Sequence, residues 1–173
     1  VGWDAYWYGD CVSLVVSSRY GGTAPWRYSG WCFDFATGQQ ITVAEMLQRM
    51  GLDPDTVQEQ VQRQAMQAFD REMAQGAYYE GLRLGGELSQ MRMDTLEYNE
   101  LENLCLLLPQ QDQLVLRGKY SCEEGWQQLD MEIPLTSAAP ADPPVLTDTY
   151  DGVQVQLEGT QAAITLSLSL IHI

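Results

Sequence analysis

Ser29–Leu47 reads SGWCFDFATGQQITVAEML and predicts, in order, a strand, a tight turn and the start of a helix. Cys32, Phe33 and Phe35 are the apolar and aromatic residues that a buried strand favours. Gly38 can adopt a backbone angle that other residues avoid, so the turn is expected to end the strand there. Strand, turn and helix start are therefore specified within one short stretch.

The start of the predicted helix carries a capping signal. Thr42 and Glu45 form a T-x-x-E capping box ahead of the apolar Met46 and Leu47. Asp34, at the end of the strand, is expected to accept N–H bonds from Thr37 or its neighbours, as in an Asx turn. A ligand or catalytic role for this carboxylate is the less favoured alternative.

The composition and the net charge limit which functions the chain can have. The chain has 173 residues, of which 45% are hydrophobic, enough for one good core or for one domain plus a fragment. Its formal net charge is −15. This charge argues against binding to nucleic acid and to anionic membranes, which both require clustered positive charge. A cationic protein partner would be attracted, although an acidic surface can also serve solubility alone.

Histidine and cysteine chemistry have little support. Residues 168–173, LSLIHI, match the translation of a common sequencing adapter, so they are left out of the reasoning together with His172, the one histidine. Without a histidine, Ser-His and Cys-His catalysis have no base. The four cysteines lack C-x-x-C spacing, so a zinc site is not expected. Two disulfides and buried free thiols both remain open.

The rest of the chain predicts a mixed architecture. Asp53-Pro54 opens a helix with one apolar face that should run to about Ala74. Residues 77–102 are interrupted by glycines, and Thr95 to Glu102 is expected to form one short helical turn. Alternating or apolar runs predict further strands. These strands are Cys11–Val16, Trp26–Phe35, Leu104–Leu108, Leu114–Tyr120 and Leu129–Ile133.

The predicted fold class is α+β: a mostly antiparallel β-sheet packed against one long α-helix, followed by a truncated β-hairpin module. The first domain is expected to span residues 1–135. Residues 136–144 form a linker by composition, and residues 145–173 form the truncated β module. Because the chain starts without Met and inside a strand-rich region, we expect an upstream part, which could include a membrane anchor, to be missing.

One family shares this pattern. The segments LVV at Leu14, YGG at Tyr20, CFDFATG at Cys32 and ITVAEML at Ile41 resemble the extracytoplasmic domain of RsiV-like anti-sigma factors. That domain also occurs in peptidoglycan deacetylases and in uncharacterised secreted bacterial proteins. The resemblance covers about residues 8–135. It implies a bacterial envelope location and a fold that binds a ligand outside the cell, in the best-understood case the cationic protein lysozyme.

Candidate binding residues come from two sets. The first is a dense group of aromatic residues, which could form an exposed platform or simply pack the core. The second is an acidic series near the middle of the chain, which could bind Ca²⁺ or a basic partner or form a solvated face. The residues singled out are Trp7, Trp26, Tyr28, Trp31, Asp94, Glu97 and Glu100.

The predicted function is a non-catalytic extracytoplasmic module that binds a protein or a cell-wall ligand, with no cofactor. The main alternative is an accessory domain of a cell-wall enzyme such as a peptidoglycan deacetylase. A free-standing hydrolase that uses paired carboxylates is a third alternative, although no pair stands out in the sequence.

Overall fold

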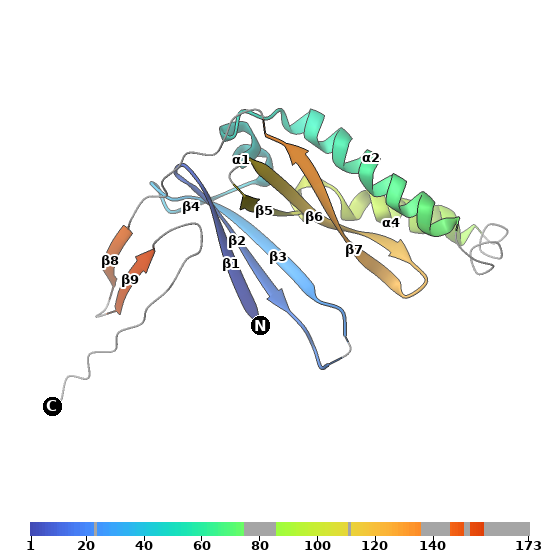
Figure 1. Ribbon diagram of the computed structural model, residues 1–173, viewed down its shortest axis with the longest axis horizontal. Coiled ribbons are helices and arrows are strands. Elements are labelled where there is room, and N and C mark those ends of the chain that lie inside the picture. The colour runs from blue at the N-terminus through green and yellow to red at the C-terminus, as the bar shows by residue number, and fades with distance from the viewer. Residues whose placement is uncertain (23, 75–85, 111, 136–145, 151–152, 158–173) are drawn as a thin grey trace.

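The computed structural model describes residues 1–22, 24–74, 86–110, 112–135, 146–150 and 153–157 (Figure 1). The described part is an α+β fold with antiparallel sheets. Its elements are β1 (Gly2–Tyr8), β2 (Cys11–Ser18), β3 (Arg27–Asp34), β4 (Gln39–Ile41), α1 (Val43–Arg49), α2 (Pro54–Met73), α4 (Glu87–Tyr98), η1 (Leu101–Asn103), β5 (Cys105–Gln110), β6 (Gln113–Cys122), β7 (Gly125–Pro134), β8 (Leu146–Tyr150) and β9 (Val153–Leu157).

Four strands form the N-terminal sheet, here called sheet A, in the order β1-β2-β3-β4. The predicted hairpin of β2 and β3 is confirmed, with Cys11 opposite Asp34 and Ser18 opposite Arg27. Strand β1 pairs antiparallel with β2 and forms one edge of the sheet. The second sheet, sheet B, has the order β5-β6-β7.

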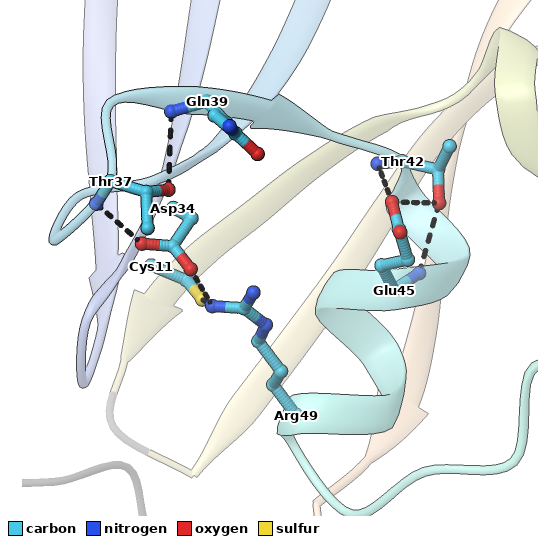
Figure 2. A network of polar contacts seen from close by, with 7 residues as sticks. All are labelled: Cys11, Asp34, Thr37, Gln39, Thr42, Glu45 and Arg49. Atoms are coloured by element: carbon cyan, nitrogen blue, oxygen red, sulfur yellow. Dashed lines mark hydrogen bonds and ion pairs between the residues drawn. The ribbon is translucent and has the colours of Figure 1, made fainter.

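The stretch that follows β3 folds as its sequence predicts (Figure 2). Asp34 Oδ1 accepts the backbone N–H of Thr37 at 3.0 Å, and Gly38 has a φ of 70°, a conformation that favours glycine. Thr42 and Glu45 form the reciprocal capping box of α1. The turn role predicted for Asp34 is thus confirmed.

Arg49 at the end of α1 ties the helix back to this turn. Its Nη1 lies 2.7 Å from Asp34 Oδ2 and 3.3 Å from Cys11 Sγ (Figure 2). The hydrogen bonds from Arg49 and from the backbone of Thr37 lower the pKa of the Asp34 carboxyl. This ion pair fixes α1 against the β2–β3 end of sheet A, where Met46 and Leu47 are buried with Cys11 and Cys32.

Helix α2 begins and ends close to the predicted bounds. The Asp53 side chain accepts the backbone N–H of Thr56 at 3.1 Å, and Pro54 occupies the first turn. The apolar residues that recur every three or four positions along α2 are buried. They are Val57, Val61, Ala65, Ala68, Phe69 and Met73.

Sheet B is the middle layer of the described domain. One of its faces contributes Leu106, Leu116 and Met131 to the main core together with α2, and α4 also contacts β6. The other face packs on sheet A, where Val15 is buried with Cys105, Leu107 and Val115. A hydrogen bond of 2.6 Å from Ser13 Oγ to the carbonyl of Leu106 joins the two sheets.

Two expectations about this architecture are wrong. One sheet was expected, but the strands β1 to β7 form two packed sheets. The sequence of a strand shows which residues share a face, but it does not show which sheet the strand joins. The layer over sheet B contains α4 beside α2, whereas one long helix was expected. Helix α4 was missed because the glycines before it, Gly85 and Gly86, end any helical pattern and because Thr95 is its one fully buried side chain.

The C-terminal hairpin was expected to pair Val153–Leu157 with a return strand from Ala163 to Ser167, which lies outside the described residues. The first strand is present as β9, and it pairs antiparallel with β8, which precedes it, from Leu146 opposite Leu157 to Tyr150 opposite Val153. The predicted linker at 136–144 and the adapter-like residues 168–173 lie outside the described residues.

Candidate functional site

A groove of about 570 Å³ lies between the start of β3, the face of sheet B beyond the start of β5, and the C-terminal end of α4. Aromatic and charged side chains line this groove. Its lining residues are Arg27, Tyr28, Ser29, Glu97, Tyr98, Asn103, Cys105, Arg117, Gly118, Lys119, Trp126 and Gln128. Three of the nine basic residues of an otherwise acidic chain therefore meet in one groove.

Lys119 lies between two aromatic rings. Its Nζ is 4.2 Å from the ring centroid of Tyr98 and 5.4 Å from that of Trp126. The pairing of β6 with β7 places Lys119 opposite Gln128 and Ser121 opposite Trp126, which brings the lysine and the tryptophan to one face of sheet B. Such cation–π contacts hold the ammonium without using its three N–H donors, which remain available to a ligand.

Arg117 forms the floor of the groove. Its Nε and Nη2 each lie 2.7 Å from an oxygen of Asp130, and its guanidinium carbon lies 4.3 Å from the ring centroid of Tyr28. The two-pronged hydrogen bond from Arg117 lowers the pKa of the Asp130 carboxyl, despite partial burial. Because the pair spans β6 and β7 while Tyr28 comes from β3, this contact fixes the two sheets relative to each other.

A second hollow of about 530 Å³ adjoins the groove and shares Trp126 and Gln128 with it. Trp26 and Pro25, just before β3, form one side of this hollow, and Cys122 forms part of the other. The guanidinium of Arg19 lies over the ring of Trp26 at 5.6 Å. The second hollow is acidic, since Glu72, Glu123 and Glu124 also line it. The combination of aromatic rings with ammonium and guanidinium groups, which suits sugar rings and carboxylates, is therefore confined to the first groove.

The residues predicted from sequence are only partly brought together. Tyr28 and Glu97 line the groove, and Trp26 lines the adjoining hollow. Trp31 is 39% exposed but lies on the opposite face of sheet A. Asp94 and Glu100 lie on and just after α4 and do not line the groove.

The prediction that Trp7 belongs to an exposed platform is wrong. Its side chain is only 6% exposed and packs edge-to-face on Phe35, with ring centroids 4.9 Å apart. Neighbouring aromatic residues of β1 alternate between the two faces of sheet A, so the N-terminal aromatic group cannot form one platform.

Sequence reasoning missed four central residues of the groove: Tyr98, Arg117, Lys119 and Trp126. The sequence did contain a signal for Arg117 and Lys119. These residues lie two positions apart in a strand of the predicted hairpin, so they share one face with every second residue of the partner strand. Placing Tyr28 and Tyr98 beside them requires contacts between distant segments, which no local pattern encodes.

Among the residues that the structure describes, no group of three or more His, Cys, Asp or Glu side chains lies close enough to hold a metal ion. The cysteines are free thiols, buried at Cys11, Cys32 and Cys105 and half-buried at Cys122. None of the described helices is long and apolar enough to cross a membrane.

Thiol reactivity provides a test of the cysteine environments. Burial raises the pKa of Cys32 and Cys105 to about 11, so at pH 8 only on the order of 0.1% of each is thiolate. We expect Ellman's reagent to modify Cys122 first and the three buried thiols slowly, with all four reacting in denaturant. Two or more rapidly reacting thiols in the folded protein would contradict this assignment, as would a total below four in denaturant.

Comparisons with known proteins add no relative: no family model, no curated protein and no solved structure matches this chain. The resemblance to RsiV-like domains therefore stays a prediction from the motifs quoted above.

Proposed function

We propose that the chain is a non-catalytic extracytoplasmic module that binds a cell-wall ligand, a glycan bearing carboxylate groups, in the groove between sheets A and B. The observation that carries the proposal is the placement of Lys119 between Tyr98 and Trp126, beside Arg117 stacked on Tyr28. The extracytoplasmic location rests on the family resemblance.

The chemistry of the groove matches such a ligand. Sugar rings present apolar C–H faces that pack on aromatic rings, and Trp126 and Tyr98 offer such rings at the groove wall. Carboxylates on the sugars or on attached peptides would accept charge-assisted hydrogen bonds from Lys119 and from the free N–H groups of Arg117. Bacterial cell-wall glycans carry both kinds of group, which supports this ligand class over a neutral polymer.

The same groove would serve the alternative function, an accessory domain that holds a cell-wall substrate for a deacetylase encoded on the same chain. A cationic protein such as lysozyme is a different kind of partner. It would be drawn to the net charge of −15 and to exposed carboxylates such as Glu97 and Glu100, rather than to the basic floor of the groove.

Trp126→Ala should weaken binding of a soluble disaccharide–peptide fragment of the cell wall at least ~10-fold, equivalent to about 1.4 kcal/mol. Isothermal titration calorimetry at ~0.15 M salt measures this loss. Trp31→Ala is the matched control, because Trp31 is partly exposed on the opposite face of sheet A. Equal affinities for the two variants, or no binding to the unsubstituted chain, would refute the proposal.

A parallel titration with lysozyme separates the protein partner from the glycan. Exposed charges are screened within ~8 Å at ~0.15 M salt, so affinity that disappears between low salt and this concentration marks a non-specific attraction. Salt-resistant binding that Trp126→Ala leaves unchanged would place the protein partner outside the groove.

A further inference from the structure

The first half of strand β3 has a free edge. Strand β3 pairs with β2 along its whole length, whereas β4 pairs only with its last residues, Cys32 to Asp34. No strand of the described residues pairs with the other side of β3 from Arg27 to Trp31. Figure 1 shows β4 near α1, at the end of β3 remote from the loop that joins β2 to β3. A row of unpaired strand edge therefore remains near that loop.

The hydrogen-bond pattern of β3 shows which backbone groups this edge presents. Phe35 N–H donates to the carbonyl of Asp10 at 2.7 Å. This pair continues the β2–β3 register by one step, since Cys11 lies opposite Asp34. In an antiparallel ladder, such hydrogen-bonded pairs alternate with pairs whose backbone groups point away from each other. Tyr28, seven residues before Phe35 in the same register, is of the second kind, so its N–H and C=O point to the free edge.

The free edge forms a wall of the groove between sheets A and B. Tyr28 faces sheet B, where its ring stacks on Arg117, and Ser29 therefore belongs to the opposite face of sheet A. Both residues line the groove, and Ser29 is exposed. A groove that touches neighbouring residues of opposite faces must reach the strand edge between them. The unpaired N–H and C=O of Tyr28 lie at that edge.

An extended peptide is the kind of ligand that a free strand edge accepts. Such a peptide pairs its own N–H and C=O groups with those of the strand, so the main chain supplies much of the affinity. A glycan chain has no regular row of alternating donors and acceptors and would leave the edge unpaired. The edge is thus a feature of the groove that a glycan does not use.

The charges of the groove favour a peptide that carries a carboxylate. Arg27, Arg117 and Lys119 line the groove, and Glu97 is the one carboxylate among its described lining residues. Lys119 lies two residues beyond Arg117 on β6, which corresponds to about 7 Å, the length of two residues of extended chain. A C-terminal carboxylate about two residues from the residue that pairs with Tyr28 would therefore reach the Lys119 ammonium.

We propose that the groove captures the carboxylate end of an extended peptide, which adds to the free edge of β3 as a further strand and places its terminal carboxylate on Lys119. The partner is then a protein with an extended, exposed C-terminal segment. This ligand is additional to the cell-wall glycan, and the inference rests on the strand edge and the cations rather than on glycan binding.

Single N-methyl groups in a peptide test the strand pairing. The probe is an acetylated pentapeptide of alternating valine and threonine with a free C-terminal carboxylate, titrated calorimetrically into the full chain. In an added strand every second N–H faces β3. Methylation at alternate amides should therefore weaken binding at least ~10-fold, and methylation at the amides between them less than ~2-fold. Similar losses at all amides would overturn the proposal, as would no binding of the unmethylated peptide.

A second titration tests the terminal carboxylate. Amidation of the C-terminus should weaken binding about 10-fold in the unsubstituted chain and less than ~2-fold in Lys119→Met, where the ammonium is already absent. Arg63→Met is the matched control, because it removes one charge from an exposed site outside the groove and should keep the full effect of amidation. An equal effect of amidation in the two variants would refute the role of Lys119.

The glycan and the peptide are tested separately. Loss of binding to the disaccharide–peptide fragment refutes the glycan and leaves the alternating pattern of the N-methyl series unaffected. Conversely, a series without alternation refutes strand addition and leaves the calorimetric result for the glycan as it stands.

Discussion

Gly118→Ala is expected to lower the free energy of unfolding by about 3 kcal/mol or more, a large part of the stability of a domain of this size. A Cβ on Gly118 would lie 2.0 Å from Asn99 Oδ1 and 2.9 Å from Leu104 Cδ2. Asn99 cannot move aside cheaply, because its Nδ2 donates to the carbonyls of Thr95 at 2.6 Å and Lys119 at 2.8 Å. The added methyl must therefore break these buried bonds or separate α4 from β6.

Urea denaturation followed by circular dichroism measures the loss. Gly22→Ala is the matched control, because a Cβ there meets nothing closer than Arg19 Nη2 at 3.9 Å. Asn99→Ala in the Gly118→Ala background should remove the main clash, so the two substitutions together should cost less than the sum of each alone. A Gly118→Ala protein as stable as the Gly22→Ala control would show that α4 is not packed on β6 as described.

Gly30→Val is expected to destabilise the protein by about 2–3 kcal/mol and to weaken ligand binding in the groove. A Cβ on Gly30 would lie 3.1 Å from Cys105 Cα and 3.2 Å from both Cβ and Sγ of that residue, so the backbones of the two sheets are in contact here. Pushing them apart strains the hydrogen bond between Ser13 and Leu106. It also displaces Tyr28 from Arg117, because Tyr28 lies two residues from Gly30 on β3.

The two effects of Gly30→Val can be separated. Thermal unfolding reports the lost packing, and calorimetric titration with the disaccharide–peptide fragment, performed well below the unfolding temperature, reports the groove. Cys105→Gly removes the Cβ and Sγ contacts and should restore part of the stability in the double variant. Gly22→Val serves as the exposed control. Unchanged stability for Gly30→Val would contradict the close packing of the two sheets.

Local features of the fold could be predicted from sequence because a few adjacent residues determine them. The Thr42–Glu45 capping box, the Asp53 cap of α2 and the turn at Asp34 each close a hydrogen bond between residues three apart. The division into two sheets could not be predicted, since it depends on contacts such as that of Ser13 with Leu106, 93 residues away. Hydrophobic alternation gives the faces of a strand but not its partner.

A smaller part of the candidate site than of the fold could be predicted from the sequence. Tyr28 and Glu97 were singled out for their residue types, and the structure brings them to one groove. Their neighbours Arg117 and Lys119 were not, because a basic residue in a half-buried strand usually marks only the solvent side of a sheet. A binding role for these two cations can be inferred only from the aromatic rings that β3, β7 and α4 place around them.

Lys119 is the one lysine of the chain, so the groove contains its one side-chain amine. Among the side chains, an amine-directed reagent such as a fluorescent succinimidyl ester would therefore label the groove alone, and the label on the α-amine would fall in a different peptide. Occupancy of the groove could then be followed as protection of a single peptide in a mass spectrum. The same scarcity makes the groove sensitive to acetylation, which would remove the ammonium and with it a principal donor to an anionic ligand.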